Sequence, residues 1–311
     1  MTRSIAALAA VLVTLVACAA GGGRVATPTP SDGPPPASPG TTRTPGPSAA
    51  IAHLSGATDL VLRIDTGGGL VPVGYFLTHL PAVSVYGDGR VITQGPQIEI
   101  YPGPALPNLL VSRVSEAGLQ AILGAARDAG LLGPDASYPY PGIMDAPTTT
   151  FVVGADGATH TTSAYALGIG QDAVGITPQE AAARARLAAF SGQLSDLPGW
   201  LGSDVVAAEA PFAFDAIRVL VTPGEPTATD AGITPSVADW PLAQPLDTSG
   251  IPLEGVGQPG TRCVIVTGDD LATVRPVLDA ADQLTYLRSA GSIWAMSLRP
   301  LLPDEVGCPA T

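Results

Sequence analysis

The sequence predicts an α+β fold in which antiparallel sheets carry helices packed on one face, in two units that follow a disordered tether. Strand-like segments come in pairs joined by Asp-Gly turns, which is typical of antiparallel hairpins. Between these pairs lie segments whose apolar residues recur at helical spacing behind a capping residue. Because the order is strands, helix, strands, helix, we expect the helices to cover one face of a sheet.

Composition divides the 311-residue chain into four parts. Residues 1–17 are interpreted as a signal peptide. Residues 18–55 are expected to form a disordered tether, because a segment dominated by Pro, Gly, Ser and Thr buries too little apolar surface to offset its ordering entropy. The first α+β unit is expected at residues 56–202 and the second at residues 203–311.

Turn and capping residues place the elements of the first unit. Asp88-Gly89 and Asp156-Gly157 each predict a hairpin turn. Thr177 and Glu180 form a capping-box pattern around Pro178, which favours a helix start. The expected elements are a strand over 59–65, a hairpin over 82–93, a strand over 109–114, a helix from Ser115 to about Gly130, a second hairpin over 148–165, and a helix from Thr177.

The second unit repeats the same kinds of element around a long Pro- and Gly-rich connection at 223–259. Asp269 and Asp270 are expected to cap a helix that Pro276 kinks or restarts. The expected elements are a strand over 215–222, a buried strand over 262–267, a helix over 269–281, and a hairpin over 284–299.

The amino-terminal segment has the order of a secretory signal peptide: a charged start, a short apolar run over 5–16, and small residues after it. Twelve apolar residues are too few for a membrane-spanning helix, which needs about 20. Leu15-Val16-Ala17-Cys18 resembles the bacterial lipobox. The resemblance implies that Cys18 is lipidated and becomes the first residue of the mature chain. The alternative is an ordinary secreted protein with a cysteine at this position.

Two cysteines remain once Cys18 is assigned to the lipid. Cys263 and Cys308 are expected to pair, because disulfides form and persist in exported proteins. Two free buried thiols are the alternative. A metal pair is disfavoured, since neither cysteine has a His or another Cys at ligand spacing.

The charge balance limits the classes of partner. The net charge is −13, and all 14 basic residues are arginine. A nucleic-acid partner requires a basic face, so the balance argues against one. An anionic lipid surface would also repel the folded part, which is compatible with attachment through a lipid rather than a basic patch.

A second resemblance covers most of the folded part. Tyr86-Gly87-Asp88-Gly89, the helix at Ser115 and Asp145-Ala146-Pro147-Thr148 are similar to uncharacterised bacterial domains. The run over 299–305 with Cys308 resembles the ending of actinobacterial lipoproteins of unknown function. This resemblance implies no molecular activity for the chain.

No catalytic motif is present in the sequence. This absence argues against an enzyme but leaves the question open. No cofactor or metal is expected, because the glycine-rich runs lack the context of a nucleotide site and the histidines lack metal-ligand spacing. Asp269 and Asp270 are expected to cap a helix rather than to form a functional site. The tryptophans are expected to lie in the hydrophobic core rather than to line a ligand cleft. The residues considered as candidate sites on these grounds are His53, His79, His160, Gly67–Gly69, Gly255–Gly260, Asp269, Asp270, Trp200, Trp240 and Trp294.

Together these features predict a membrane-anchored extracytoplasmic lipoprotein, held on the outer face of the cell membrane by acylated Cys18. The expected role is a non-enzymatic binding or interaction module of the cell envelope, whose partner is an envelope protein or a small ligand. The alternatives are a small-molecule binding lipoprotein of a transport or sensing system, and a hydrolase of wall polymers.

Overall fold

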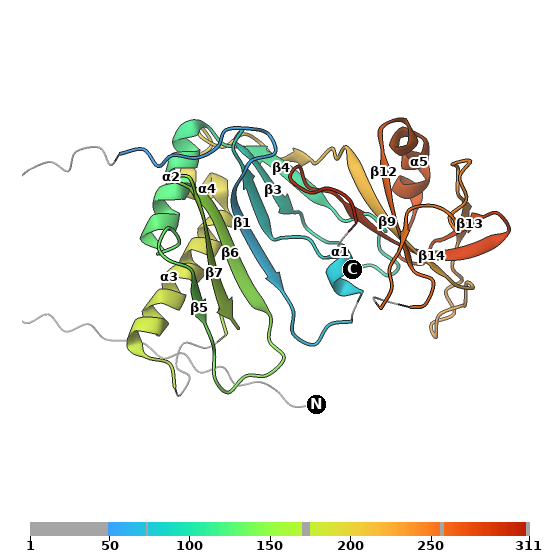
Figure 1. Cartoon of the computed structure of the whole chain (residues 1–311), viewed down its shortest axis with the longest axis horizontal. Coiled ribbons are helices and arrows are strands. Elements are labelled where there is room, and N and C mark those ends of the chain that lie inside the picture. Colours follow the sequence, from blue (N-terminus) through green and yellow to red (C-terminus); the bar gives the residue numbers. More distant parts are fainter. Residues whose placement is uncertain (1–48, 73, 170–174, 256–257, 309–311) are drawn as a thin grey trace, which may run out of the picture. The chain divides into compact units, whose positions relative to one another are not determined.

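Two mostly antiparallel sheets and five helices make up the part of the chain that the computed structural model describes, which is residues 49–72, 74–169, 175–255 and 258–308 (Figure 1). The α+β class predicted from the sequence is confirmed. The predicted signal peptide at 1–17, Cys18 and the tether up to residue 48 lie outside the described residues.

The first sheet has eight strands in the order β5-β7-β6-β1-β2-β3-β4-β8. All neighbours are antiparallel except β5 and β7, which are parallel. The strands are β1 (Leu60–Gly67), β2 (Val83–Tyr86), β3 (Arg90–Gln94), β4 (Leu109–Arg113), β5 (Ala136–Tyr138), β6 (Thr148–Ala155), β7 (Ala158–Tyr165) and β8 (Ala210–Pro211).

Local turn chemistry forms the two hairpins predicted in the first unit. Gly89 has a φ of 84°, and its amide donates to the Tyr86 carbonyl at 3.0 Å to close the β2–β3 turn. In the β6–β7 turn, Asp156 and Gly157 both have positive φ, 51° and 77°. Asp and Gly adopt a positive φ at low cost, so an Asp-Gly pair in the sequence is a specific indication of such a turn.

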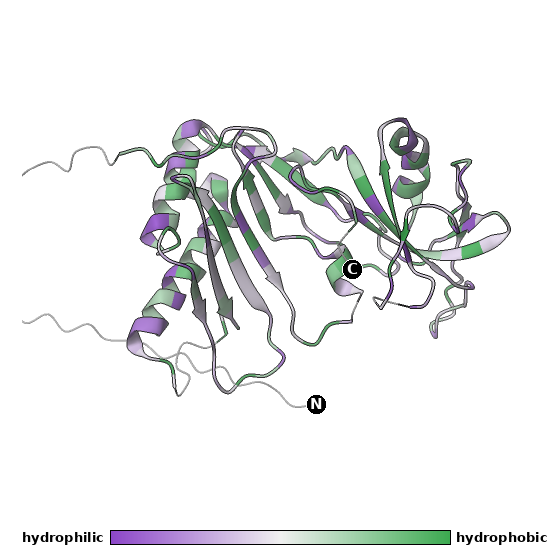
Figure 2. Cartoon of the chain, in the orientation of Figure 1, coloured by the Kyte–Doolittle hydropathy of each residue, from purple (hydrophilic) through white to green (hydrophobic). Residues whose placement is uncertain are grey.

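Side-chain caps start two of the helices as predicted. Ser115 Oγ accepts from the Gly118 amide at the start of α2 (Glu116–Asp128). At the start of α3 (Pro178–Leu194), Thr177 and Glu180 complete a reciprocal capping box. Both helices carry hydrophobic and hydrophilic residues, and they lie on one face of the first sheet together with the short α4 (Leu197–Leu201) (Figures 1 and 2).

The second sheet has six strands in the order β10-β13-β14-β9-β12-β11. Only the β10–β13 pair is parallel. The elements are β9 (Ala216–Pro223), β10 (Val237–Asp239), β11 (Ile251–Pro252), β12 (Arg262–Thr267), α5 (Gly268–Ala280), β13 (Tyr286–Ser289) and β14 (Ser292–Pro300). Hydrophobic residues dominate β9 and β12 (Figure 2), as expected for strands with buried faces.

The helix before β13 differs from its prediction at two points. Its N-cap residue is Thr267 rather than Asp269 or Asp270, which lie in the first turn. Carboxylates in that turn still interact favourably with the helix dipole. Pro276 lies inside one continuous helix, α5, so the helix does not restart there.

Residues 49–55, which the predicted tether was expected to include, pack against the core. Ile51 is buried among the core residues, and its amide and carbonyl both bond to the Gln120 side chain on α2. A Cβ on Gly87 would lie 2.2 Å from the Leu54 carbonyl oxygen, so only glycine admits this close approach. Residues 49–55 are therefore part of the folded unit.

Residues from both predicted units meet in one core. Tyr86, Ile92 and Leu109 of the first sheet are buried in the same cluster as Ile217 and Val219 of β9. The opposite face of the first sheet packs against α2 and α3 in a second cluster. Strands β2 and β3 are thus covered on both faces over part of their length. Within the described ranges, no helix has the length and apolar character needed to cross a membrane.

Candidate functional site

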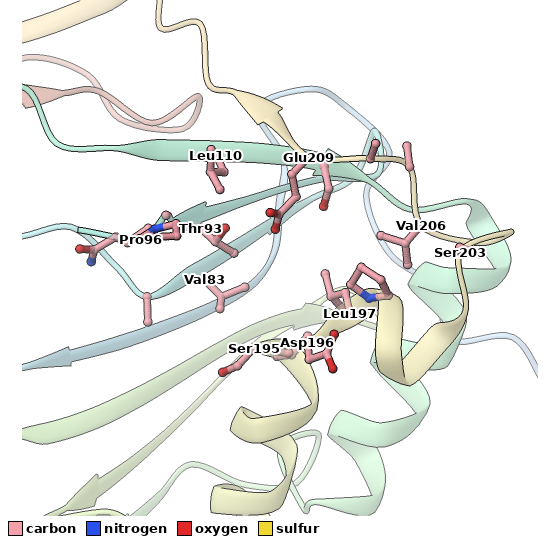
Figure 3. Close-up of a pocket in the computed structure, with 18 of the residues that line it drawn as sticks. Val83, Thr93, Pro96, Leu110, Ser195, Asp196, Leu197, Ser203, Val206 and Glu209 are labelled. Carbon is pink, nitrogen blue, oxygen red and sulfur yellow. The ribbon is translucent and has the colours of Figure 1, made fainter. Parts of the chain in front are cut away.

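A cleft of about 930 Å³ opens where the helices leave part of the first sheet uncovered (Figure 3). Its floor is a row of side chains that lie side by side on neighbouring strands. Val83 of β2 pairs with Thr93 of β3, and Thr93 pairs with Leu110 of β4. Because side chains alternate between the two faces of a sheet, this row lies on the opposite face from Ile92 and Leu109. The volume lies within the range of small-molecule sites, about 300–1,000 Å³.

The walls of the cleft come from two segments. One wall is the end of α3 and the start of α4, with Leu194 and Leu197. The other is the segment over 203–209, which runs along β4 because the Ala207 amide donates to the Arg113 carbonyl at 2.8 Å. Figure 3 shows Asp196 on the helix side of the cleft and Glu209 on the strand side.

Three polar side chains of the cleft form hydrogen bonds within the chain. Ser195 Oγ donates to the Ser191 carbonyl at 3.1 Å, and Gln94 Nε2 donates to the Leu80 carbonyl at 2.8 Å. Asp196 Oδ1 accepts from the Gly199 amide at 3.0 Å and so caps α4.

Glu209 differs from these groups. Within the described residues its carboxylate has no hydrogen bond and no ion pair, although it lines the cleft. No described residue that lines the cleft is Arg or His. The cleft therefore carries negative charge without a cation to balance it.

A second polar cluster joins the two sheets through the segment after β14. Asp304 Oδ1 accepts from Tyr86 Oη at 2.7 Å and from the Arg63 guanidinium at 2.8 Å. Burial of the Tyr86 phenol and its hydrogen bond to Asp304 raise its pKa far above the usual value. Burial alone would lower the pKa of Arg63, but the hydrogen bond to Asp304 and the charge of that carboxylate outweigh it and raise the pKa.

The same segment is attached to the second sheet at three further points. Arg299 of β14 forms two hydrogen bonds with Glu305, and Arg218 of β9 donates to the Gly307 carbonyl at 3.0 Å. Cys308 forms a disulfide with Cys263 of β12, as predicted. We refer to residues 303–308 as the clamp segment. Its contacts are structural, since they satisfy buried polar groups rather than leave them available to a ligand.

The three histidines do not converge. His79 Nε2 contacts Asp65 Oδ1 at 2.5 Å, while His53 contacts Glu116 and His160 contacts the Gly133 carbonyl. Among the residues that the structure describes, no group of three or more His, Cys, Asp or Glu side chains could hold a metal ion.

The other residues weighed in the sequence also lie apart from the cleft. Trp240 and Trp294 are buried in the shared core, and Trp200 packs against the helix-covered core. β1 ends at Gly67, and the next two glycines have positive φ in the loop that follows. The Gly255–Gly260 run lies partly outside the described residues, and its described part precedes β12. Cys18 lies outside the described residues altogether.

Sequence reasoning did not find the cleft residues. Val83 and Thr93 were expected in a hairpin, but nothing in the sequence showed which strand row would remain uncovered by helices. Glu209 lies in an irregular segment, and its position depends on backbone bonds to β4, about 100 residues earlier in the chain. The sequence near either segment does not indicate that two such distant segments will pair.

No protein-family model matches the chain, and neither a curated protein nor a solved structure does.

Proposed function

We propose that this protein is a lipid-anchored, extracytoplasmic binding module of the bacterial cell envelope. The observation that carries the proposal is Leu15-Val16-Ala17-Cys18 at the end of a short apolar run. Acylation of Cys18 would attach the chain to the outer face of the membrane, and more than one acyl chain is needed for a durable anchor.

The disulfide between Cys263 and Cys308 supports an extracytoplasmic location. Disulfides persist in oxidising compartments and are rare where cellular thiols are kept reduced. The Cys18 thiol is thus the one cysteine outside this pair, as the lipidation proposal requires.

The cleft favours a small-molecule ligand as one form of this binding function. It has an apolar floor formed by Val83 and Leu110, a rim of small hydroxyl and carboxylate groups, and room for a compact ligand. A hydrolase would require acid and base groups free to act. Asp196 is engaged as a helix cap, so the geometry gives that alternative less support than binding.

Cys18→Ser in the full chain tests the anchor. We expect the wild-type chain to sediment with membranes and to incorporate a clickable palmitate analogue, whereas the variant loses the label and leaves the membrane fraction. Ala19→Ser is the matched control, because it alters the neighbouring residue and keeps the acceptor thiol. Retention of the Cys18→Ser variant on membranes with undiminished labelling would refute the proposal.

A further inference from the structure

We infer that the cleft over β2, β3 and β4 binds a small amphiphilic cation, with an ammonium or guanidinium head at Glu209 and an apolar body on the sheet. This inference rests on the proposed function as a binding protein, and it adds the chemical class of the ligand. Its basis is the combination of a cleft that has apolar residues in its lining with a carboxylate that has no partner in the described part of the chain (Figure 3).

The apolar part of the site comes from both sides of the cleft. Val83 and Leu110 lie on the floor, and Leu194, Leu197 and Val206 reach it from the walls. Four of these five side chains are also buried against neighbouring residues, so the surface is held by the core and does not depend on a ligand for its position. The half-buried Leu110 and the exposed lining residues Ala82, Pro96 and Pro198 present the apolar surface from which a ligand would displace water, which favours binding.

The charge of the site selects the head group. Glu209 and Asp196 are the ionisable residues of the described lining, and both are negative. Asp196 Oδ1 accepts from the Gly199 amide, whereas neither carboxylate oxygen of Glu209 has a partner in the described residues. An anionic head would be repelled by the exposed carboxylates of Glu209 and Asp196, whereas a cationic head would be attracted to them.

Two arginines on the strands beside this wall, Arg113 and Arg90, are engaged elsewhere and do not neutralise Glu209. Arg113, whose carbonyl anchors the wall at Ala207, directs its guanidinium to Asp88. Arg90 also bonds to Asp88 and to the Ala57 carbonyl. The charge must therefore be balanced from outside the described chain, by solvent ions or by a ligand.

Three probes with one apolar body and different heads test this inference: hexylamine, hexan-1-ol and hexanoate. Binding is measured by methyl NMR and calorimetry on the full chain carrying Cys18→Ser, which removes the lipid acceptor. We expect hexylamine to bind most tightly and to shift the methyl signals of Val83, Leu110 and Val206. Raising the ionic strength should weaken hexylamine binding and leave hexanol binding unchanged.

Glu209→Gln is the decisive variant, since the Glu209 side chain is exposed and its loss removes no contact in the described residues. We expect the dissociation constant of hexylamine to rise by about fivefold, the effect of losing one partly exposed ion pair, with no change for hexanol. Glu225→Gln is the matched control, with the same change of charge at an exposed position after β9. Thr93→Trp should fill the floor and abolish binding of both probes.

The outcomes separate the two proposals. If hexylamine and hexanol bind equally and Glu209→Gln changes neither, the cleft binds ligands but the cation inference is wrong. If hexanoate binds as tightly as hexylamine, the inference is also wrong. If no probe shifts the cleft methyl groups, the cleft is not the binding site, whereas the membrane anchor is decided separately by Cys18→Ser.

Discussion

Arg299 and Glu305 form a bidentate ion pair, with one guanidinium nitrogen 2.5 Å from Oε2 and the other 2.6 Å from Oε1. The Arg299 side chain is only 7% exposed, and its Nε donates to the His79 carbonyl at 2.8 Å. Glu305 also accepts from the Leu302 amide. The pair therefore fixes the clamp segment to β14 and to the loop before β2 at the same time.

Removing one partner of this pair should cost more than removing an exposed ion pair. We expect Glu305→Gln to lower the free energy of unfolding by about 3 kcal/mol, because it leaves the buried Arg299 charge without its counter-charge. Asp239→Asn is the control: it breaks the Arg288–Asp239 pair, whose side chains are 53% and 79% exposed, and should cost less than about 1 kcal/mol. Denaturant titrations measure both, and equal losses would contradict the prediction.

The disulfide should stabilise the fold mainly by restricting the unfolded chain. Cys263 and Cys308 are 45 residues apart, and closing a loop of this length is worth about 4 kcal/mol in the chain-entropy model. We expect the Cys263→Ser, Cys308→Ser double variant to lose about that much free energy of unfolding. A reductant should destabilise the wild-type chain by a similar amount and leave the double variant unchanged. A reductant effect of equal size on the double variant would show that the disulfide is not the cause.

Tyr86 should make the fold sensitive to alkaline pH. Its folded pKa lies above the unfolded value of 10.0, so the folded state keeps a proton that the unfolded state releases. The stabilisation is complete below pH 10 and is lost progressively as the pH rises above that value. We expect Tyr86→Phe to flatten this dependence, measured by denaturant titration between about pH 9 and pH 11. Tyr101→Phe, at an exposed ring, should keep the wild-type slope; a wild-type slope in Tyr86→Phe would refute the assignment.

Arg184 should stabilise the fold through backbone carbonyls rather than through an acidic partner. This buried side chain donates to the carbonyls of Tyr138, Tyr165 and Ala166, and burial lowers its pKa. We expect Arg184→Met to lower the free energy of unfolding by about 2–3 kcal/mol, because it leaves buried acceptors unpaired. Arg186→Met lies on the exposed side of the same helix and should change stability by less than about 0.5 kcal/mol. Similar losses in both variants would contradict this role.

Elements with their own local chemistry could be predicted from the sequence. The turns at Asp88-Gly89 and Asp156-Gly157, and the caps at Ser115 and Thr177, each depend on residues within a few positions of one another. The disulfide was predicted by elimination among three cysteines, once Cys18 was assigned to the lipid.

Features that depend on distant parts of the chain could not be predicted. Strands β8 and β11 have two residues each, too few for an alternating pattern, and they form only because a longer strand pairs with them. Arg63 and Asp304 are separated by 241 positions, and nothing in the sequence near either residue indicates the other. The short α1 (Tyr75–Thr78) was missed for a similar reason, because it packs against β14 and has no side-chain cap of its own.

Alternate residues of strands β2, β3 and β4 face two different surfaces, the cleft and the core shared with the second sheet. Thr93 and Leu110 line the cleft, while their neighbours Ile92 and Leu109 lie in the core shared with the second sheet. Mutational tolerance along β3 and β4 should therefore alternate: the half-buried Thr93 and Leu110 should accept more substitutions than the buried Ile92 and Leu109. Under the proposed binding function, a change of ligand specificity would need substitutions only at the cleft-facing positions and would leave the packing between the sheets unaltered.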